Sequence, residues 1–129
     1  MADATTDDAA YQAQILNGVS RTFALTIPQL PAPLRSVVTN AYLLCRVADT
    51  IEDDVALTPA EKRAYHRRLA DVLHFRADAA ALSQELAPRL SDEALADERD
   101  LVAHLDAVTR VLASFPQEQR DVVVQGVEL

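Results

Sequence analysis

The residues of this chain best suited to chemistry lie between positions 42 and 54. Segment 49–54 has the sequence Asp-Thr-Ile-Glu-Asp-Asp. Four polar side chains would share one helical face, within about 60° of one another: Tyr42, Arg46, Asp49 and Asp53. Two carboxylates one turn apart weaken an isolated helix by about 0.2–0.5 kcal/mol unless a cation lies between them. Since Mg²⁺ is held by one or two carboxylates together with substrate phosphates, the spacing predicts a helix that presents magnesium to a diphosphate.

A solvated helix face is the alternative interpretation of these carboxylates, because acidic i,i+4 pairs are common on helix surfaces. The same helix also carries apolar residues at core spacing: Leu34, Val38, Ala41, Cys45 and Ala48. We expect this aliphatic stripe to be buried, with the acidic face beside it and not opposite it. Tyr42 and Arg46 suit the wall of a polar cavity better than a solvent face. From spacing alone both interpretations stay open.

Two segments of the chain resemble the squalene/phytoene synthase family. Residues 19–24 have the sequence Val-Ser-Arg-Thr-Phe-Ala, and residues 40–54 have Asn-Ala-Tyr-Leu-Leu-Cys-Arg-Val-Ala-Asp-Thr-Ile-Glu-Asp-Asp. The acidic part is more similar to that of squalene synthases than to the Asp-Asp-rich form common in phytoene and dehydrosqualene synthases. The resemblance covers residues 14–54 by motif and the rest of the chain by helical pattern alone.

The resemblance implies an all-α fold, the N-terminal part of an isoprenoid-synthase-type helical bundle. It also implies that two farnesyl diphosphates are joined head to head, first into the cyclopropyl compound presqualene diphosphate and then, with hydride from NADPH, into squalene. Magnesium ions would make each diphosphate a leaving group, and an apolar channel would keep water from the allylic cation. Phytoene or dehydrosqualene remains an alternative product. Head-to-tail synthases typically use Asp-Asp-x-x-Asp motifs, which this chain lacks.

The family's acidic and aromatic residues can be carried over onto positions of this sequence. Asp49, Glu52 and Asp53 are expected to hold Mg²⁺. Tyr42 is expected beside Asp49 and Asp53 as the third catalytic residue, with simple packing as its alternative role. Phe23 is expected to line the hydrophobic channel, where the face of its ring can stabilise a carbocation, or else to pack in the core.

Three further residues are expected to bind the substrate diphosphate: Ser20, Arg21 and Arg46. An arginine suits this role because its planar guanidinium makes bidentate contacts to phosphate. Arg21 and Arg46 are also expected to meet the phosphates of NADPH. The structural alternatives are that Ser20 and Arg21 cap a turn, and that Arg46 pairs with Asp49 in a surface ion pair worth under ~1 kcal/mol.

The sequence lacks the second aspartate-rich motif that members of the family carry far downstream. Segments 92–93 and 97–100 are acidic, but we expect them in the first turns of a helix, where acids stabilise the positive dipole end. Residues 1–129 are therefore expected to be the N-terminal portion of one synthase domain. Such a portion would be inactive alone and marginally stable or self-associating through exposed apolar surface. A non-catalytic acidic helical interaction module is the alternative from another class.

Composition excludes other classes of function. A net charge of −8 argues against nucleic acid as a partner. No signal peptide and no apolar run of transmembrane length occurs, so a cytoplasmic location is expected. Any membrane contact would be peripheral, through a part outside this sequence, and the oligomeric state stays open. Cys45, the single cysteine, is expected to be a small buried hydrophobe. The three histidines, His66, His74 and His104, are expected at the surface or in packing, without carboxylate partners at ligand spacing.

Capping and breaking residues predict about six helices. Residues 5–7 would cap a first helix that Gly18 ends, and Thr58 followed by a proline and a glutamate would start another. Ser91 would cap a long amphipathic helix whose inner side begins at Leu95. The predicted segments are residues 5–17, 20–27, 34–53, 58–75, 77–86, a long helix from 91 that includes 112, and a final helix from 116.

Overall fold

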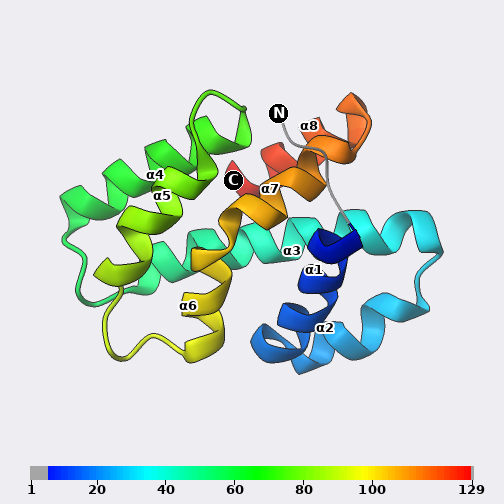
Figure 1. Ribbon diagram of the computed structural model, residues 1–129, viewed down its shortest axis with the longest axis horizontal. Helices are drawn as coiled ribbons and strands as arrows, with labels where there is room; N and C mark the ends of the chain where they lie inside the picture. The colour runs from blue at the N-terminus through cyan, green and yellow to red at the C-terminus, as the bar shows by residue number, and fades with distance from the viewer. Residues whose placement is uncertain (1–5, 129) are drawn as a thin grey trace.

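The computed structural model describes residues 6–128, which contain α-helices, short 3₁₀ helices and no strand. This confirms the all-α prediction, although these residues form eight α-helices and not about six (Figure 1). In chain order the elements are α1 (Thr6–Val19), α2 (Arg21–Thr26), η1 (Ile27–Gln29), α3 (Ala32–Asp53), α4 (Pro59–Leu73), α5 (Ala79–Leu86), η2 (Ala87–Arg89), α6 (Ala96–Ala103), α7 (Leu105–Ser114) and α8 (Gln117–Glu128). None of these helices is long and apolar enough to cross a membrane.

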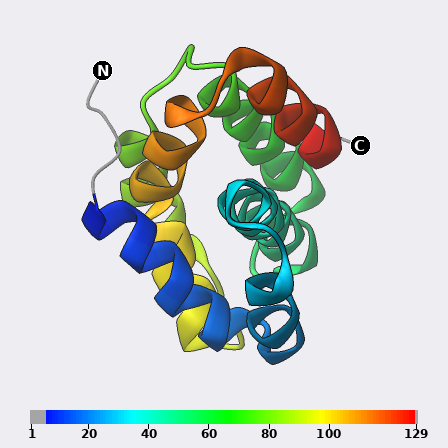
Figure 2. The same ribbon diagram turned by 90° about the vertical axis from the view of Figure 1, so that its right-hand side faces the viewer.

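The helix that carries the acidic segment, α3, runs through the middle of the molecule. It packs against α1, α4, α6, α7 and α8, and Figure 2, which looks nearly along its axis, shows these helices arranged around it. Its largest buried side chains are branched aliphatic ones: Leu43, Leu44, Val47 and Ile51. Each contributes roughly 1.5–3 kcal/mol by leaving water, so they fix which side of α3 faces the core.

The buried face of α3 is not the predicted aliphatic stripe. Leu34 is 48% exposed, and the other four stripe positions are half-buried: Val38, Ala41, Cys45 and Ala48. The prediction was wrong because spacing was weighed without side-chain size, and three of these residues are Ala or Cys. The acidic face lies about 150° around α3 from these four buried aliphatic side chains, although Tyr42 on that face is half-buried and packs against the core. Cys45 is accordingly half-buried and not fully buried.

The predicted start of α4 is confirmed by its cap. Thr58 Oγ1 accepts a hydrogen bond from the Glu61 backbone N–H, and Glu61 Oε1 accepts one from the Thr58 backbone N–H. The bond from Thr58 and a contact with Arg89 lower the pKa of the Glu61 carboxyl. At the other end α4 stops at Leu73, and Phe75 follows with φ 59°. The prolines after α2 and before α8 mark helix limits as predicted.

The predicted long helix from Ser91 is two shorter helices. Residues 91–95 form a turn, and Leu95, expected on the inner side, is 60% exposed. A break at His104 then separates α6 from α7. The ring Nδ1 of His104 lies 2.8 Å from the Asp100 carbonyl oxygen, which also accepts from the His104 backbone N–H at 3.1 Å. The remaining inner positions are buried as predicted: Leu101, Val102, Leu105, Val108 and Leu112.

Gly18 does not end the first helix, which continues through Val19. Its lack of a side chain serves a close approach, because a Cβ built there would lie 2.4 Å from Cγ of Asp97 on α6. The predicted cap at residues 5–7 falls partly outside the described residues. Gly18 thus allows α1 and α6 to pack closely against each other.

Candidate functional site

A pocket of about 250 Å³ lies between the C-terminal half of α3 and the start of α6. Three residues singled out from the sequence line it together: Arg46, Asp49 and Asp53. The facing wall comes from the loop before α6 and from its first turn, with Ser91, Glu93, Ala94 and Glu98. Carboxylates therefore lie on both walls, and Arg46 supplies a positive charge among them.

Asp54, the last residue of the acidic segment, lines this pocket and connects its two walls. It is buried, with Oδ1 accepting from the Ala56 N–H at 2.8 Å and Oδ2 from the Ser91 N–H at 2.9 Å. The second bond fastens the loop before α6 to the end of α3. Arg99 holds the same loop by donating to the backbone carbonyl of Ser91. Neighbouring aspartates thus differ in role, since Asp53 is exposed and Asp54 is structural.

Arg46 contacts the facing wall and not its own helix. Its Nη2 donates to Glu98 Oε1 at 2.5 Å, whereas the ion pair with Asp49 considered from the sequence does not form. Thr50 donates through Oγ1 to the backbone carbonyl of Arg46 at 2.8 Å. The guanidinium therefore lies on the pocket wall in a fixed position.

Glu52 lies away from this pocket. Its Oε2 is 3.1 Å from Nε2 of His66 on α4, and its backbone carbonyl accepts from Lys62 Nζ at 2.6 Å. Glu52 and His66 line a second, more apolar cavity between α3, α4 and α8, which Asp49 also borders. Asp49 therefore lies on the ridge between the two cavities. Of the three predicted metal ligands, Glu52 therefore shares a cavity with Asp49 but not with Asp53.

All three histidines contact a carboxylate, contrary to the sequence prediction that they lack such partners. Besides the Glu52 pair, His74 lies 2.7 Å from Glu128 and His104 lies 3.2 Å from Asp100. The pairs are on different parts of the surface, which confirms a surface role.

The two aromatic residues predicted to line the channel contact each other. The rings of Phe23 and Tyr42 have centroids 4.6 Å apart at an interplanar angle of 43°. Phe23 is 42% exposed and Tyr42 is half-buried, so the pair offers an apolar, π-rich surface on the N-terminal side of the acidic pocket.

Ser20 and Arg21 take different positions. Ser20 is the N-cap of α2, and its hydroxyl accepts from the Phe23 N–H at 3.2 Å, which confirms the capping alternative. Arg21 is exposed on α2, and no ion pair of Arg21 is present in the described part of the chain. Neither residue lines the acidic pocket, and the structure brings Arg21 into no contact with Arg46.

The side chains of this pocket suit a partly hydrated magnesium ion better than a metal ion held by protein ligands alone. Within residues 6–128 no group of three or more His, Cys, Asp or Glu side chains could hold a metal ion by itself. The exposed pair Asp49 and Asp53 is nevertheless one turn apart in one pocket. Mg²⁺ takes one or two carboxylates and fills its octahedron with water and phosphate oxygens. These two residues would hold it, and the ion would supply charge neutralisation to a diphosphate.

The charge of Asp49 is felt by the one cysteine. Partial burial raises the pKa of the Cys45 thiol, and the Asp49 carboxylate one turn away raises it further. A thiolate here would add negative charge to an acidic region, so the neutral thiol is favoured. The pKa of the Cys45 thiol therefore responds to the charge of Asp49, although Cys45 does not line the pocket.

The sequence did not identify the far wall of the pocket. Glu93 and Glu98 were assigned to a solvated helix start, and Asp54 was not distinguished from Asp53. Asp97 and Glu98 do lie in the first turn of α6, as expected. Ser91 does not cap α6, which begins at Ala96. No local sequence signal shows that this later start directs Glu98 toward α3.

Comparison with known proteins identifies the family of this chain. The sequence model of the squalene/phytoene synthase family matches residues 16–127. The chain belongs to the squalene/phytoene synthase family. No solved structure matches it.

Several relatives in this family carry names that specify a reaction. Squalene synthase BSS of Botryococcus braunii is 33% identical over 121 residues, which are 88% of this chain and 23% of that protein. Lycopaoctaene synthase of the same alga is 44% identical over 61 residues, 44% of this chain and 14% of that protein. Inactive squalene synthase 2 of Arabidopsis thaliana is 40% identical over 67 residues, 48% of this chain and 16% of that protein. The chain thus spans less than a quarter of the length of these relatives.

Proposed function

We propose that this chain supplies the first acidic helix of a head-to-head prenyltransferase and binds the diphosphate of a prenyl substrate together with Mg²⁺. The observation that carries the proposal is that Arg46, Asp49 and Asp53 line one pocket. Family membership supports prenyl transfer as the reaction class. The relatives named squalene synthase support squalene as the product, and farnesyl diphosphate is the substrate that the resemblance implies.

In this proposal each residue has a separate task. Asp49 and Asp53 would hold the magnesium that neutralises the diphosphate. Arg46 would donate hydrogen bonds to the phosphate oxygens, where charge develops as the bond to the allylic carbon breaks. Phe23 and Tyr42 would cover the isoprenoid chain and keep water away from the cation.

The binding step can be tested on residues 1–129 by titration calorimetry with farnesyl diphosphate. We expect weak binding that requires Mg²⁺ and is lost in Asp49→Asn and in Asp53→Asn. Asp121→Asn is the matched control, because Asp121 is an exposed aspartate of α8 far along the chain from the pocket. Binding that is absent, or equally strong without Mg²⁺, would favour the interaction-module alternative.

That alternative has one specific observation in its favour. A relative of similar identity over this region carries the name Inactive squalene synthase 2, so similarity here does not by itself guarantee catalysis. The product and the use of NADPH belong to the proposal as well. Product analysis of a complete enzyme containing this segment, with and without NADPH, separates squalene from phytoene or dehydrosqualene.

A further inference from the structure

Glu98 is an acidic residue of α6 whose carboxylate reaches across to α3. Its Oε1 accepts the 2.5 Å hydrogen bond from Arg46 Nη2, and its side chain is 17% exposed compared with 31% for that of Arg46. Because both side chains are largely shielded from water, salt and solvent weaken this pair less than they weaken an exposed ion pair. The contact therefore restricts the rotamers of a long arginine side chain.

Arg46 has other carboxylates nearby, yet Glu98 is its partner. Asp49 and Asp53 share its helical face, but neither forms an ion pair with it in the described residues. The Nε of Arg46 is buried and has no hydrogen-bond partner there. Within the described chain, the direction of the guanidinium thus depends on the contact with Glu98.

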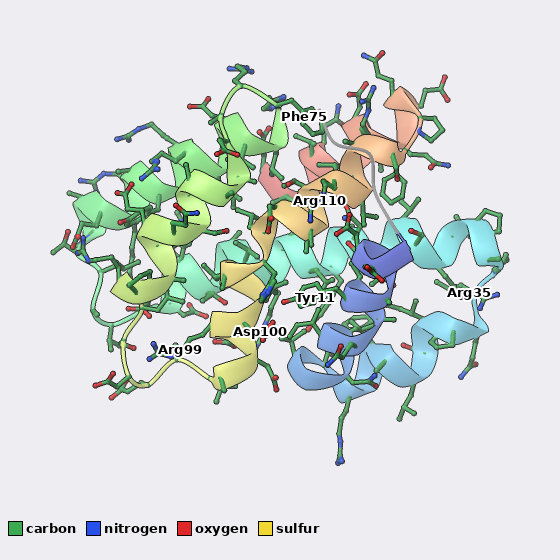
Figure 3. The ribbon with its side chains drawn as sticks, in the orientation of Figure 1. Tyr11, Arg35, Phe75, Arg99, Asp100 and Arg110 are labelled. Carbon is green, nitrogen blue, oxygen red and sulfur yellow. The ribbon has the colours of Figure 1, made fainter. Side chains whose placement is uncertain are left out.

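The position of Glu98 is itself fixed from two sides. Tyr11 on α1 donates through its hydroxyl to Asp100 Oδ1 at 2.6 Å, and Figure 3 shows these two side chains meeting between α1 and α6. Arg99 binds the backbone carbonyl of Ser91 in the preceding loop. Because the two residues that follow Glu98 are anchored, one to the preceding loop and one to α1, the start of α6 is held so that Glu98 faces α3.

We propose that Glu98 is a positioning residue for diphosphate binding, which holds the guanidinium of Arg46 in the direction that phosphate oxygens require. The inference rests on the proposed function for the identity of the ligand, Mg²⁺ with a diphosphate. An arginine fixed before binding loses less side-chain freedom when the ligand arrives. The carboxylate of Glu98 adds negative charge to a pocket that is already acidic, so its value lies in orientation and not in attraction.

Glu98→Asp is the decisive variant because it keeps the charge and shortens the side chain by one methylene. A Glu98→Gln change would be ambiguous, since removal of a negative charge by itself favours an anion. We expect Glu98→Asp to weaken the affinity of residues 1–129 for Mg²⁺–inorganic diphosphate by about 2- to 10-fold. Glu118→Asp is the matched control, because Glu118 is an exposed glutamate of α8 that does not line this pocket.

A second background distinguishes positioning from a general structural effect. In Arg46→Gln, the Glu98→Asp change should have no further effect on affinity, because the group that it positions is gone. Thermal unfolding midpoints of all variants check that each one folds. If Glu98→Asp weakens diphosphate affinity equally in the unchanged chain and in Arg46→Gln, the proposal is overturned.

The side-chain N–H signal of Arg46 gives a readout that needs no ligand. Because Nε is buried, its proton should exchange slowly with solvent in the unchanged chain. The exchange should become faster in Glu98→Asp and stay slow in Glu118→Asp. If the unchanged chain binds no diphosphate, the proposed function fails while this measurement still decides the positioning. If the exchange rate of the Arg46 Nε proton is the same in Glu98→Asp as in the unchanged chain, the inference is overturned.

Discussion

At the scale of single residues, the acidic segment shows how identical side chains take different roles from their surroundings. Asp53 is exposed and points into the pocket, whereas Asp54 is buried and accepts two backbone hydrogen bonds. A buried carboxylate keeps its charge at low cost when donors satisfy it, and its removal leaves those donors unpaired. Mutation of Asp54 should therefore destabilise the fold much more than mutation of Asp53.

Asp54→Ala should lower the free energy of unfolding by about 2–4 kcal/mol, because the Ala56 and Ser91 N–H groups lose a charged acceptor. Asp53→Ala should change it by less than ~0.5 kcal/mol, as is usual for exposed sites. Urea unfolding followed by circular dichroism measures both. Equal destabilisation by the two variants would show that Asp54 is not the fastener of the loop before α6.

Cys45 provides a test of the Asp49 charge through pH dependence. Since burial and Asp49 both raise the thiol pKa, reaction with iodoacetamide should reach half its limiting rate above the ~8.5 of an ordinary thiol. Asp49→Asn removes one cause, so the midpoint should move to lower pH, and Asp121→Asn should leave it unchanged. A midpoint that does not respond to Asp49→Asn would mean that its carboxylate lies farther from Cys45 than the structure shows.

At the scale of elements, the sequence predicted helices well where local chemistry decides and poorly where tertiary contacts decide. The start of α4 follows from a capping box contained in four residues. The buried face of α3 depends on the helices that surround it, and spacing alone chose Leu34 and its small neighbours over Leu43 and Leu44. The break at His104 lies where the backbone takes φ −115° and ψ 28°, which periodicity does not reveal.

The two glycines allow a matched test of the α1–α6 contact. Within a helix, Gly→Ala usually stabilises by up to about 1 kcal/mol. Gly126→Ala on α8 should follow this rule, since a Cβ there meets nothing within 4 Å. Gly18→Ala should be less stable than Gly126→Ala by about 1 kcal/mol or more, because Asp97 must move. A gain at Gly18 equal to that at Gly126 would contradict the close approach of α1 and α6.

At the scale of the whole molecule, the sequence identified one wall of the site and missed the other. Arg46, Asp49 and Asp53 were predicted from spacing and resemblance, and the structure gathers them in one pocket. Glu98 reaches that pocket from 52 positions along the chain, through a helix start that no local signal specifies. The resemblance also grouped Glu52 with the aspartates, but an interaction with His66 draws its side chain to another cavity. Roles of Ser20, Arg21 and NADPH stay predictions.

The same distribution of groups predicts what residues 1–129 can do alone. The acidic pocket of about 250 Å³ is smaller than the roughly 300–1,000 Å³ typical of small-ligand sites, so it accommodates a diphosphate and not two farnesyl chains. Stabilisation of a leaving diphosphate also needs groups placed around it, and the described chain offers one arginine there. Incubation with farnesyl diphosphate, Mg²⁺ and NADPH should therefore yield no squalene above a no-protein control, even where calorimetry detects binding. Squalene formed by this chain would mean that the residues described here complete the site without a second acidic helix.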